Sequence, residues 1–138
     1  MSFMKDKLKV FAYWFSTAIV LFLLGFAAVT YHVIHEQQAG FFTAFGYPEY
    51  LVYPLAYLKI VAFLVIVTHR YNDLRDMVYA AYFLNMVLAL VGHINYGDFY
   101  GHALVGLIAL PISYLLGNQV RGIPKKNLFG RWTHTPEA

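Results

Sequence analysis

The 138-residue sequence contains no cysteine. Disulfide bonds and thiolate-ligated zinc or iron–sulfur sites are therefore excluded for this chain alone, and any electron carrier must bind through other residues. Charged residues are also scarce, since Asp, Glu, Lys and Arg make up 12% of the chain while hydrophobic residues make up 60%. An ordinary soluble domain has about twice this charged fraction. Together with a mean hydropathy of +0.55, this composition predicts an integral membrane protein.

Long polar linkers, low-complexity segments and internal repeats are also lacking, and four apolar stretches fill most of the chain. They cover residues 10–31, 50–67, 77–94 and 100–116. Each can cross a hydrocarbon core about 30 Å thick as a helix, and continuous rather than alternating hydrophobicity favours helices over barrel strands. We expect one all-α domain over residues 1–138, an integral membrane four-helix transmembrane bundle with a basic tail at 117–138.

Basic residues cluster in alternate connections. They precede the first stretch, lie between the second and third, and follow the fourth: Lys5, Lys7, Lys9; Arg70, Arg75; Arg121, Lys125, Lys126, Arg131. The two other connections have no Lys or Arg, so the positive-inside rule predicts that both termini and the middle connection are cytoplasmic. This rule is sufficient to explain the basic tail, and we predict no nucleic-acid partner.

Lys59 interrupts the second apolar stretch. It lies about 13 Å along the helix from Tyr50 and about 12 Å from Val67, near the membrane midplane, and Asn85 has a similar depth in the third stretch. A lysine at this depth is a candidate functional residue. The alternative is structural: the amine reaches toward the interface or pairs with Asn85, a backbone carbonyl or buried water. For Asn85 itself, an interhelical hydrogen bond is the favoured interpretation.

Small and polar residues recur at helical spacing and predict the inward faces of three helices. These sets are Ala18, Gly25, Ala28, His32, His35 and Glu36; Ala81, Asn85, Ala89, Gly92 and His93; and His102, Gly106, Ala109 and Ser113. The connections add Glu49, Asn95 and Asp98 at the outer end. We expect a polar pocket open toward the outside with Lys59 at its floor. The candidate ligand-binding residues are Lys59, Asn85, His93, Asp98, Glu49, His32, His102 and Tyr82.

Two short histidine motifs have alternative interpretations. In YHVIHEQQ, the spacing of His32, His35 and Glu36 resembles a ligand set, but solvated interfacial histidines are the simpler interpretation, and we predict no metal site. In HINYGD, His93 and Asp98 form either an oriented acid–base pair or ordinary cap residues around Gly97. Most tyrosines suit an aromatic belt and core packing.

The segment GYPEYLVYPLAYLKIVAFLVIV, followed after a charged connection by a helix ending in HINYGD, resembles the DoxX-like family of small four-helix membrane proteins. The resemblance extends from about the first helix to Leu116. It implies a bacterial inner-membrane protein. It also implies an association with quinone-coupled redox chemistry, with a quinone as candidate cofactor and a membrane or redox protein as candidate partner.

Two hypotheses remain open at the level of sequence. In the first, the pocket binds a small anionic or carbonyl-bearing molecule such as a quinone, with Lys59 as its positive pole and His93 or Glu49 transferring protons. In the second, the protein is a non-catalytic structural or partner-docking membrane subunit. No nucleotide-binding loop or nucleophile–base motif decides between them, and the sequence does not establish an enzyme.

Overall fold

The computed structural model describes residues 1–123 and is composed of helices. The elements are α1 (Ser2–Val33), α2 (His35–Ala44), the 3₁₀ turn η1 (Glu49–Leu51), α3 (Val52–Thr68), α4 (Asn72–Tyr96) and α5 (Gly101–Val120). Four segments are long and apolar enough to cross a membrane: α1, η1 with α3, α4 and α5. The prediction of an all-α four-helix membrane bundle is confirmed, and the chain is a multi-pass membrane protein.

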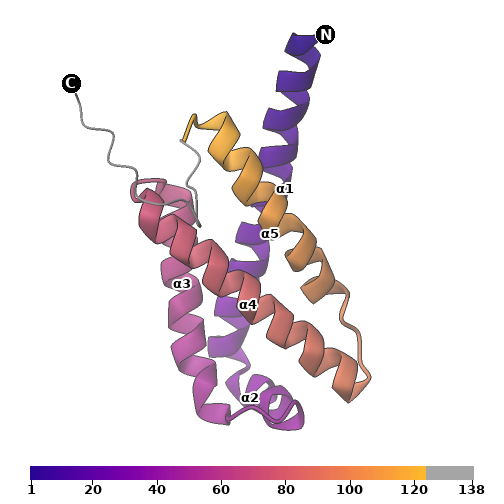
Figure 1. Ribbon diagram of the computed structural model, residues 1–138. Coiled ribbons are helices and arrows are strands. Elements are labelled where there is room, and N and C mark those ends of the chain that lie inside the picture. Colours follow the sequence, from indigo (N-terminus) through magenta and orange to yellow (C-terminus); the bar gives the residue numbers. More distant parts are fainter. Residues whose placement is uncertain (124–138) are drawn as a thin grey trace, which may run out of the picture.

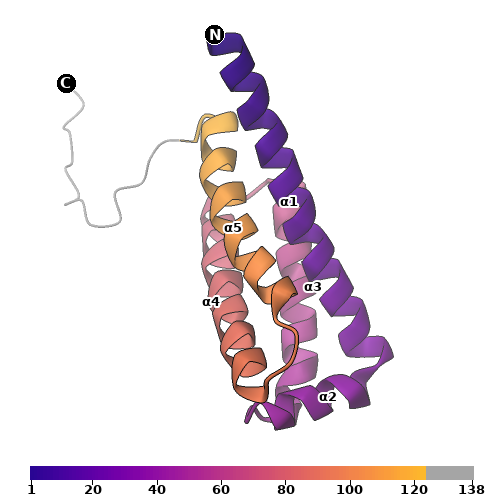
Figure 2. The same ribbon diagram turned by 90° about the vertical axis from the view of Figure 1, so that its right-hand side faces the viewer.

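The four long helices run alternately up and down, and α2 lies across one end of the bundle (Figures 1 and 2). We call this the α2 end. The connection from α4 to α5 lies at the same end, whereas the N-terminus of α1 and the C-terminus of α5 lie at the opposite end. Helix α1 packs against both α3 and α5, and α4 packs mainly against α5. The first turns of α1 project beyond the other helices (Figure 2).

Helix boundaries differ from the predicted spans mainly where a helix extends beyond its apolar stretch into charged residues. Helix α1 begins at Ser2 instead of residue 10, and α4 begins at Asn72 instead of residue 77. Apolar runs mark only the part of a helix inside hydrocarbon, while lysine and arginine are good helix formers outside it. Helix α5 continues through Val120, so the predicted tail at 117–138 begins within a helix, and residues 124–138 lie outside the described part.

The bundle places large apolar side chains on its exterior. Phe22, Leu84 and Ile108 are 67%, 63% and 57% exposed. A soluble protein rarely leaves so much apolar surface open, whereas a bilayer solvates it. The buried residues of the described part include several polar ones, namely Ser16, Thr17, Lys59, Arg75 and Ser113.

Glycines on α5 allow its close approach to neighbouring helices. A Cβ atom added at Gly106 would lie 2.8 Å from Sδ of Met86 and 3.3 Å from Cδ1 of Leu23. One added at Gly117 would lie 2.9 Å from the ring of Tyr13. Small residues at such contacts are how membrane helices gain packing energy without a hydrophobic driving force. The predicted packing role of Gly106 is confirmed.

Among the small residues predicted to face inward, Ala18 on α1 and Ala81 on α4 are exposed, so these predictions are wrong. The buried face of α4 includes the predicted Gly92 but otherwise carries larger side chains: Arg75, Tyr79, Tyr82 and Met86. A helix that is apolar on all sides shows little difference in hydrophobicity between its faces. The positions of small residues alone therefore did not predict correctly which face of the helix points inward.

Arg75 is also misplaced by the sequence prediction, which put it in the connection between the second and third spans. It lies one turn inside α4 and is only 4% exposed. The connection is limited to residues 69–71.

Candidate functional site

A cavity of about 460 Å³ occupies the half of the bundle nearest α2. Its walls come from α1, α2, α3 and α4, with one residue from α5. This volume is within the range of about 300–1,000 Å³ that is usual for small-molecule sites. Most lining side chains are apolar or aromatic. Five predicted ligand-binding residues line it together: Lys59, Tyr82, Asn85, His93 and His102.

The floor of the cavity is formed by the lining residues farthest from the α2 end. These are Phe22 on α1, Lys59 on α3 and Tyr82 on α4. Beyond them, the packed core of the bundle contains Val20 and Leu110, which are almost fully buried. The position predicted for Lys59, at the floor of a pocket, agrees with this geometry.

Lys59 is 4% exposed, and its Nζ has no hydrogen-bond partner among the described residues. Nζ instead lies 4.2 Å from the centroid of the Tyr31 ring, so the ammonium contacts the negative face of an aromatic ring. Pairing with Asn85, which the sequence suggested through their similar depth, is therefore wrong. The reason is that equal depth does not place two residues on facing sides: α3 packs mainly against α1, the helix that carries Tyr31.

Tyr82 supplies a second unpaired polar group. The residue is 4% exposed, and its hydroxyl has no hydrogen-bond partner within residues 1–123. A buried polar group without a partner costs about 1–3 kcal/mol. Native proteins rarely leave such groups unsatisfied, and here both of them line the same cavity.

The α2 end of the cavity carries a histidine–carboxylate pair. Nδ1 of His93 lies 2.6 Å from Oδ1 of Asp98, and the ring of His102 stands perpendicular to that of His93 at 4.7 Å between centroids. Gly97 makes this pair by ending α4 in the left-handed conformation, at φ 82°, which turns the chain so that Asp98 returns to His93. Asp98 does not line the cavity but holds the His93 ring from behind. The structure thus brings together the residues of the predicted acid–base pair.

His32 and Glu49 do not line this cavity. Nδ1 of His32 lies 2.7 Å from the carbonyl oxygen of Ala28 in its own helix. Because successive helical residues are about 100° apart, Tyr31 faces the cavity while His32 turns away from it. Glu49 is exposed and borders a separate shallow hollow with His35. The single outward pocket predicted from the sequence is therefore two separate hollows.

The two histidines of YHVIHEQQ, whose spacing resembles that of metal ligands, do not lie on one helix. Helix α1 ends at Val33 and α2 begins at His35, so His32 and His35 belong to different helices. The His35 ring stacks on Tyr53 at 4.1 Å between centroids. Within residues 1–123, no three His, Asp or Glu side chains are grouped to hold a metal ion.

Comparison of the chain with protein-family models, curated proteins and solved structures gives no match. The DoxX-like resemblance therefore stays a prediction from short motifs. Any functional assignment depends on the chemistry of the cavity itself.

Aromatic residues that the sequence prediction overlooked supply much of the cavity wall. Phe41 and Phe42 extend from α2 and Phe45 directly follows it, in a connection where the sequence predicted no helix. In FFTAF, Phe45 follows Phe42 by three residues and Phe41 by four, which is a helical spacing that was available in the sequence. Phe22 and Phe26 line the cavity and are also 67% and 59% exposed, so the cavity reaches the lipid-facing surface beside α1.

Proposed function

We propose that this protein binds a small, largely apolar molecule bearing hydrogen-bond acceptors, and that the ligand class is a quinone. The observation that carries the proposal is the pair of buried, unpartnered polar groups, Lys59 Nζ and Tyr82 OH, at the floor of an aromatic cavity. A quinone presents a flat ring to aromatic walls and carbonyl oxygens to donors. The Lys59 ammonium and the Tyr82 hydroxyl are both donors, so their chemistry fits such a head group.

His93 and Asp98 suit the protonation that accompanies quinone chemistry. A quinone takes up two electrons and two protons when it is reduced to a quinol. The His93 imidazole lines the cavity, and its partner Asp98 is 30% exposed, so the pair links the ligand site to the surface at the α2 end. Asp98 orients the ring through its hydrogen bond with Nδ1 of His93. In this proposal the electrons are exchanged with a separate redox protein.

Access from the bilayer is consistent with an apolar ligand. The exposed cavity residues Phe22 and Phe26 lie on the membrane-spanning part of α1, where lipid chains would contact them. A quinone with an isoprenoid tail could enter the site sideways and leave its tail among the lipids. The basic-residue pattern would place the cavity in the outer half of the membrane, and the DoxX-like resemblance suggests a bacterial inner membrane.

The test is saturable quinone binding and its dependence on Tyr82. The full chain, purified in mild detergent, is extracted with solvent to identify retained quinone and then titrated in nanodiscs with decylubiquinone. We expect about one site per chain, and Tyr82→Phe should weaken binding about five- to tenfold because one hydrogen bond is lost. Tyr100→Phe is the matched control, since Tyr100 lies outside the cavity. Non-saturable uptake would contradict quinone binding, and equal affinities in all three proteins would contradict the part that Tyr82 plays in the site.

A structural or partner-docking function is the second candidate, and one observation favours it. The first turns of α1 project from the bundle and expose Phe3, Met4 and Leu8, each by about two thirds of its surface. A photoreactive amino acid at Phe3 would test this in native membranes. A single discrete crosslinked product, together with no saturable decylubiquinone binding, would favour docking over the quinone site.

A further inference from the structure

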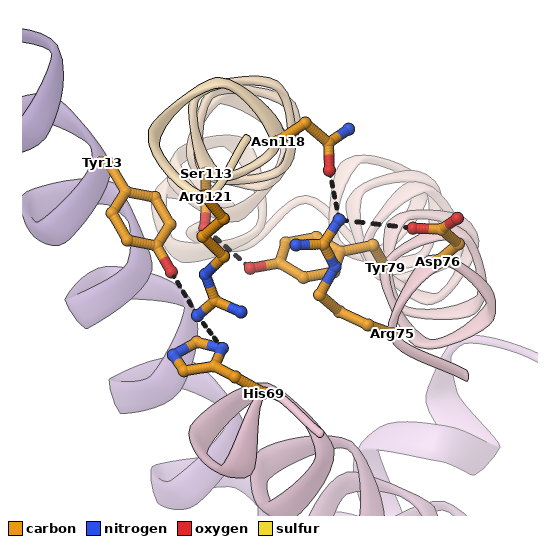
Figure 3. A network of polar contacts seen from close by, with 8 residues as sticks. All are labelled: Tyr13, His69, Arg75, Asp76, Tyr79, Ser113, Asn118 and Arg121. Carbon is orange, nitrogen blue, oxygen red and sulfur yellow. Dashed lines mark hydrogen bonds and ion pairs between the residues drawn. The ribbon is translucent and has the colours of Figure 1, made fainter. Parts of the chain in front are cut away.

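A second polar cluster lies at the end of the bundle opposite α2 and is separate from the cavity. Figure 3 shows side chains from α1, α4 and α5, and from the residue that directly follows α3, converging there. The cluster comprises Tyr13, His69, Arg75, Asp76, Tyr79, Ser113, Asn118 and Arg121. We call it the arginine cluster. The proposed quinone site does not use any of these residues, so the two sites are tested independently.

Arg75 is the buried member of the arginine cluster. Its guanidinium donates hydrogen bonds to Oδ1 of Asn118 and, at 3.4 Å, to Oδ1 of Asp76. It also lies over the Tyr114 ring, with Cζ 5.4 Å from the centroid. Nevertheless, the buried Nε of Arg75 has no partner within the described residues. This guanidinium is thus incompletely satisfied although the residue is only 4% exposed.

Arg121 supplies a second and more accessible guanidinium. It donates hydrogen bonds to the Tyr13 hydroxyl, at 2.8 Å, and to Nδ1 of His69. His69 ends α3 in the left-handed conformation, at φ 54°, which is unusual for a residue other than glycine. The partners of Arg121 are therefore a neutral phenol and an imidazole, and none of the hydrogen bonds described for it neutralises its charge.

The network below these arginines is made of hydroxyl groups. Ser113 is hydrogen-bonded to Thr17 at 2.7 Å and to Tyr79 at 2.8 Å, and all three side chains are buried. Hydroxyl groups rigidify the helix ends without adding charge. The arginine cluster thus holds two guanidinium groups against one carboxylate, a surplus of positive charge within a membrane protein.

We propose that the arginine cluster binds an anionic phosphate group, supplied by a phospholipid head group or by free phosphate. Guanidinium groups match phosphate oxygens in geometry and charge, and basic pockets between transmembrane helices on the cytoplasmic side are a known mode of lipid recognition. The cluster is built from Tyr13 on α1, the ends of α3 and α5 and the first turns of α4, where the bundle meets the interface. This is also the end that the basic-residue pattern predicts to be cytoplasmic.

The experiment compares two phospholipids of equal chain length that differ in net charge: phosphatidylglycerol is anionic, whereas the phosphate of phosphatidylcholine is balanced by its own choline cation. The full chain in mild detergent is titrated with phosphatidylglycerol or phosphatidylcholine, and bound lipid is counted by native mass spectrometry. In a separate arm, its thermal stability is measured with inorganic phosphate or chloride at equal ionic strength. We expect preferential retention of one phosphatidylglycerol, and Arg121→Gln should reduce this preference about fivefold. Arg121→Lys should restore it only in part, because an ammonium lacks the guanidinium fork.

Arg70→Gln is the matched control, because Arg70 is an exposed basic residue in the same connection as His69 but outside the arginine cluster. A helical, monodisperse Arg121→Gln protein with reduced preference, beside an unchanged Arg70→Gln protein, supports the site. Stabilisation by inorganic phosphate without lipid preference supports it with free phosphate as the source. Equal losses in both variants, or no preference and no phosphate effect in the parent protein, overturn it.

Discussion

Replacing Lys59 with methionine separates the functional and structural interpretations of the membrane amine. Methionine keeps the length of the side chain and removes its charge. A central lysine costs about 2.5–3.5 kcal/mol to insert, and its contact with the Tyr31 ring returns about 2 kcal/mol in a desolvated setting. Because Nζ has no hydrogen bond to lose within the described residues, Lys59→Met should be more stable by about 0.5–1.5 kcal/mol.

The same substitution should impair ligand binding. A hydrogen bond to a charged donor contributes about 1.5–3 kcal/mol, so the affinity for decylubiquinone should fall about 10- to 100-fold. Lys59→Arg should recover little of this loss, since a planar guanidinium does not reproduce a compact ammonium at the same position. Thermal unfolding in detergent and decylubiquinone titration in nanodiscs measure the two effects on the same preparations.

The matched control is Leu55→Met, which alters an uncharged cavity residue one turn away on α3. It should change the affinity by less than about threefold, because it substitutes one apolar side chain for another of similar volume. A Lys59→Met protein that binds decylubiquinone as well as the parent and melts no lower would remove Lys59 from the site. One that fails to fold would show that the amine's contact with Tyr31 is structural.

Three further predictions concern the bundle itself. Gly106→Val should destabilise the protein by about 1–3 kcal/mol in denaturant titration through overpacking, while Gly40→Val, where a Cβ meets open space, should have little effect. Ser113→Ala leaves the hydroxyls of Thr17 and Tyr79 without their common partner and should cost about 1–3 kcal/mol in the same assay; an unchanged midpoint would contradict this. Reporter fusions should place both termini in the cytoplasm, and a reporter active outside would reverse the predicted orientation.

The candidate site was predictable in part because depth along a helix can be counted. Five of the predicted residues do share one cavity, since they occupy the same half of the bundle. The direction in which a side chain points around the helix axis could not be obtained from the sequence by such counting. Tyr31 and His32 are adjacent in sequence, yet Tyr31 contacts Lys59 while His32 bonds to its own helix.

By itself, the sequence determined the membrane environment and the number of membrane-spanning helices. Continuous apolar runs of nearly 20 residues satisfy their backbone groups in a bilayer only as helices, whatever their neighbours. The charged connections likewise predict an orientation without any contact being known.

The tertiary structure alone decided which side chains meet. It paired Lys59 with an aromatic ring instead of Asn85, and it moved Arg75 from a predicted connection into a buried cluster. The physical reason is that lipid accepts nearly every face of an apolar helix, so hydrophobicity does not fix its rotation. Close contacts at glycines such as Gly106, and hydrogen bonds such as those of Ser113, distinguish between rotations, and these depend on residues far apart in the sequence.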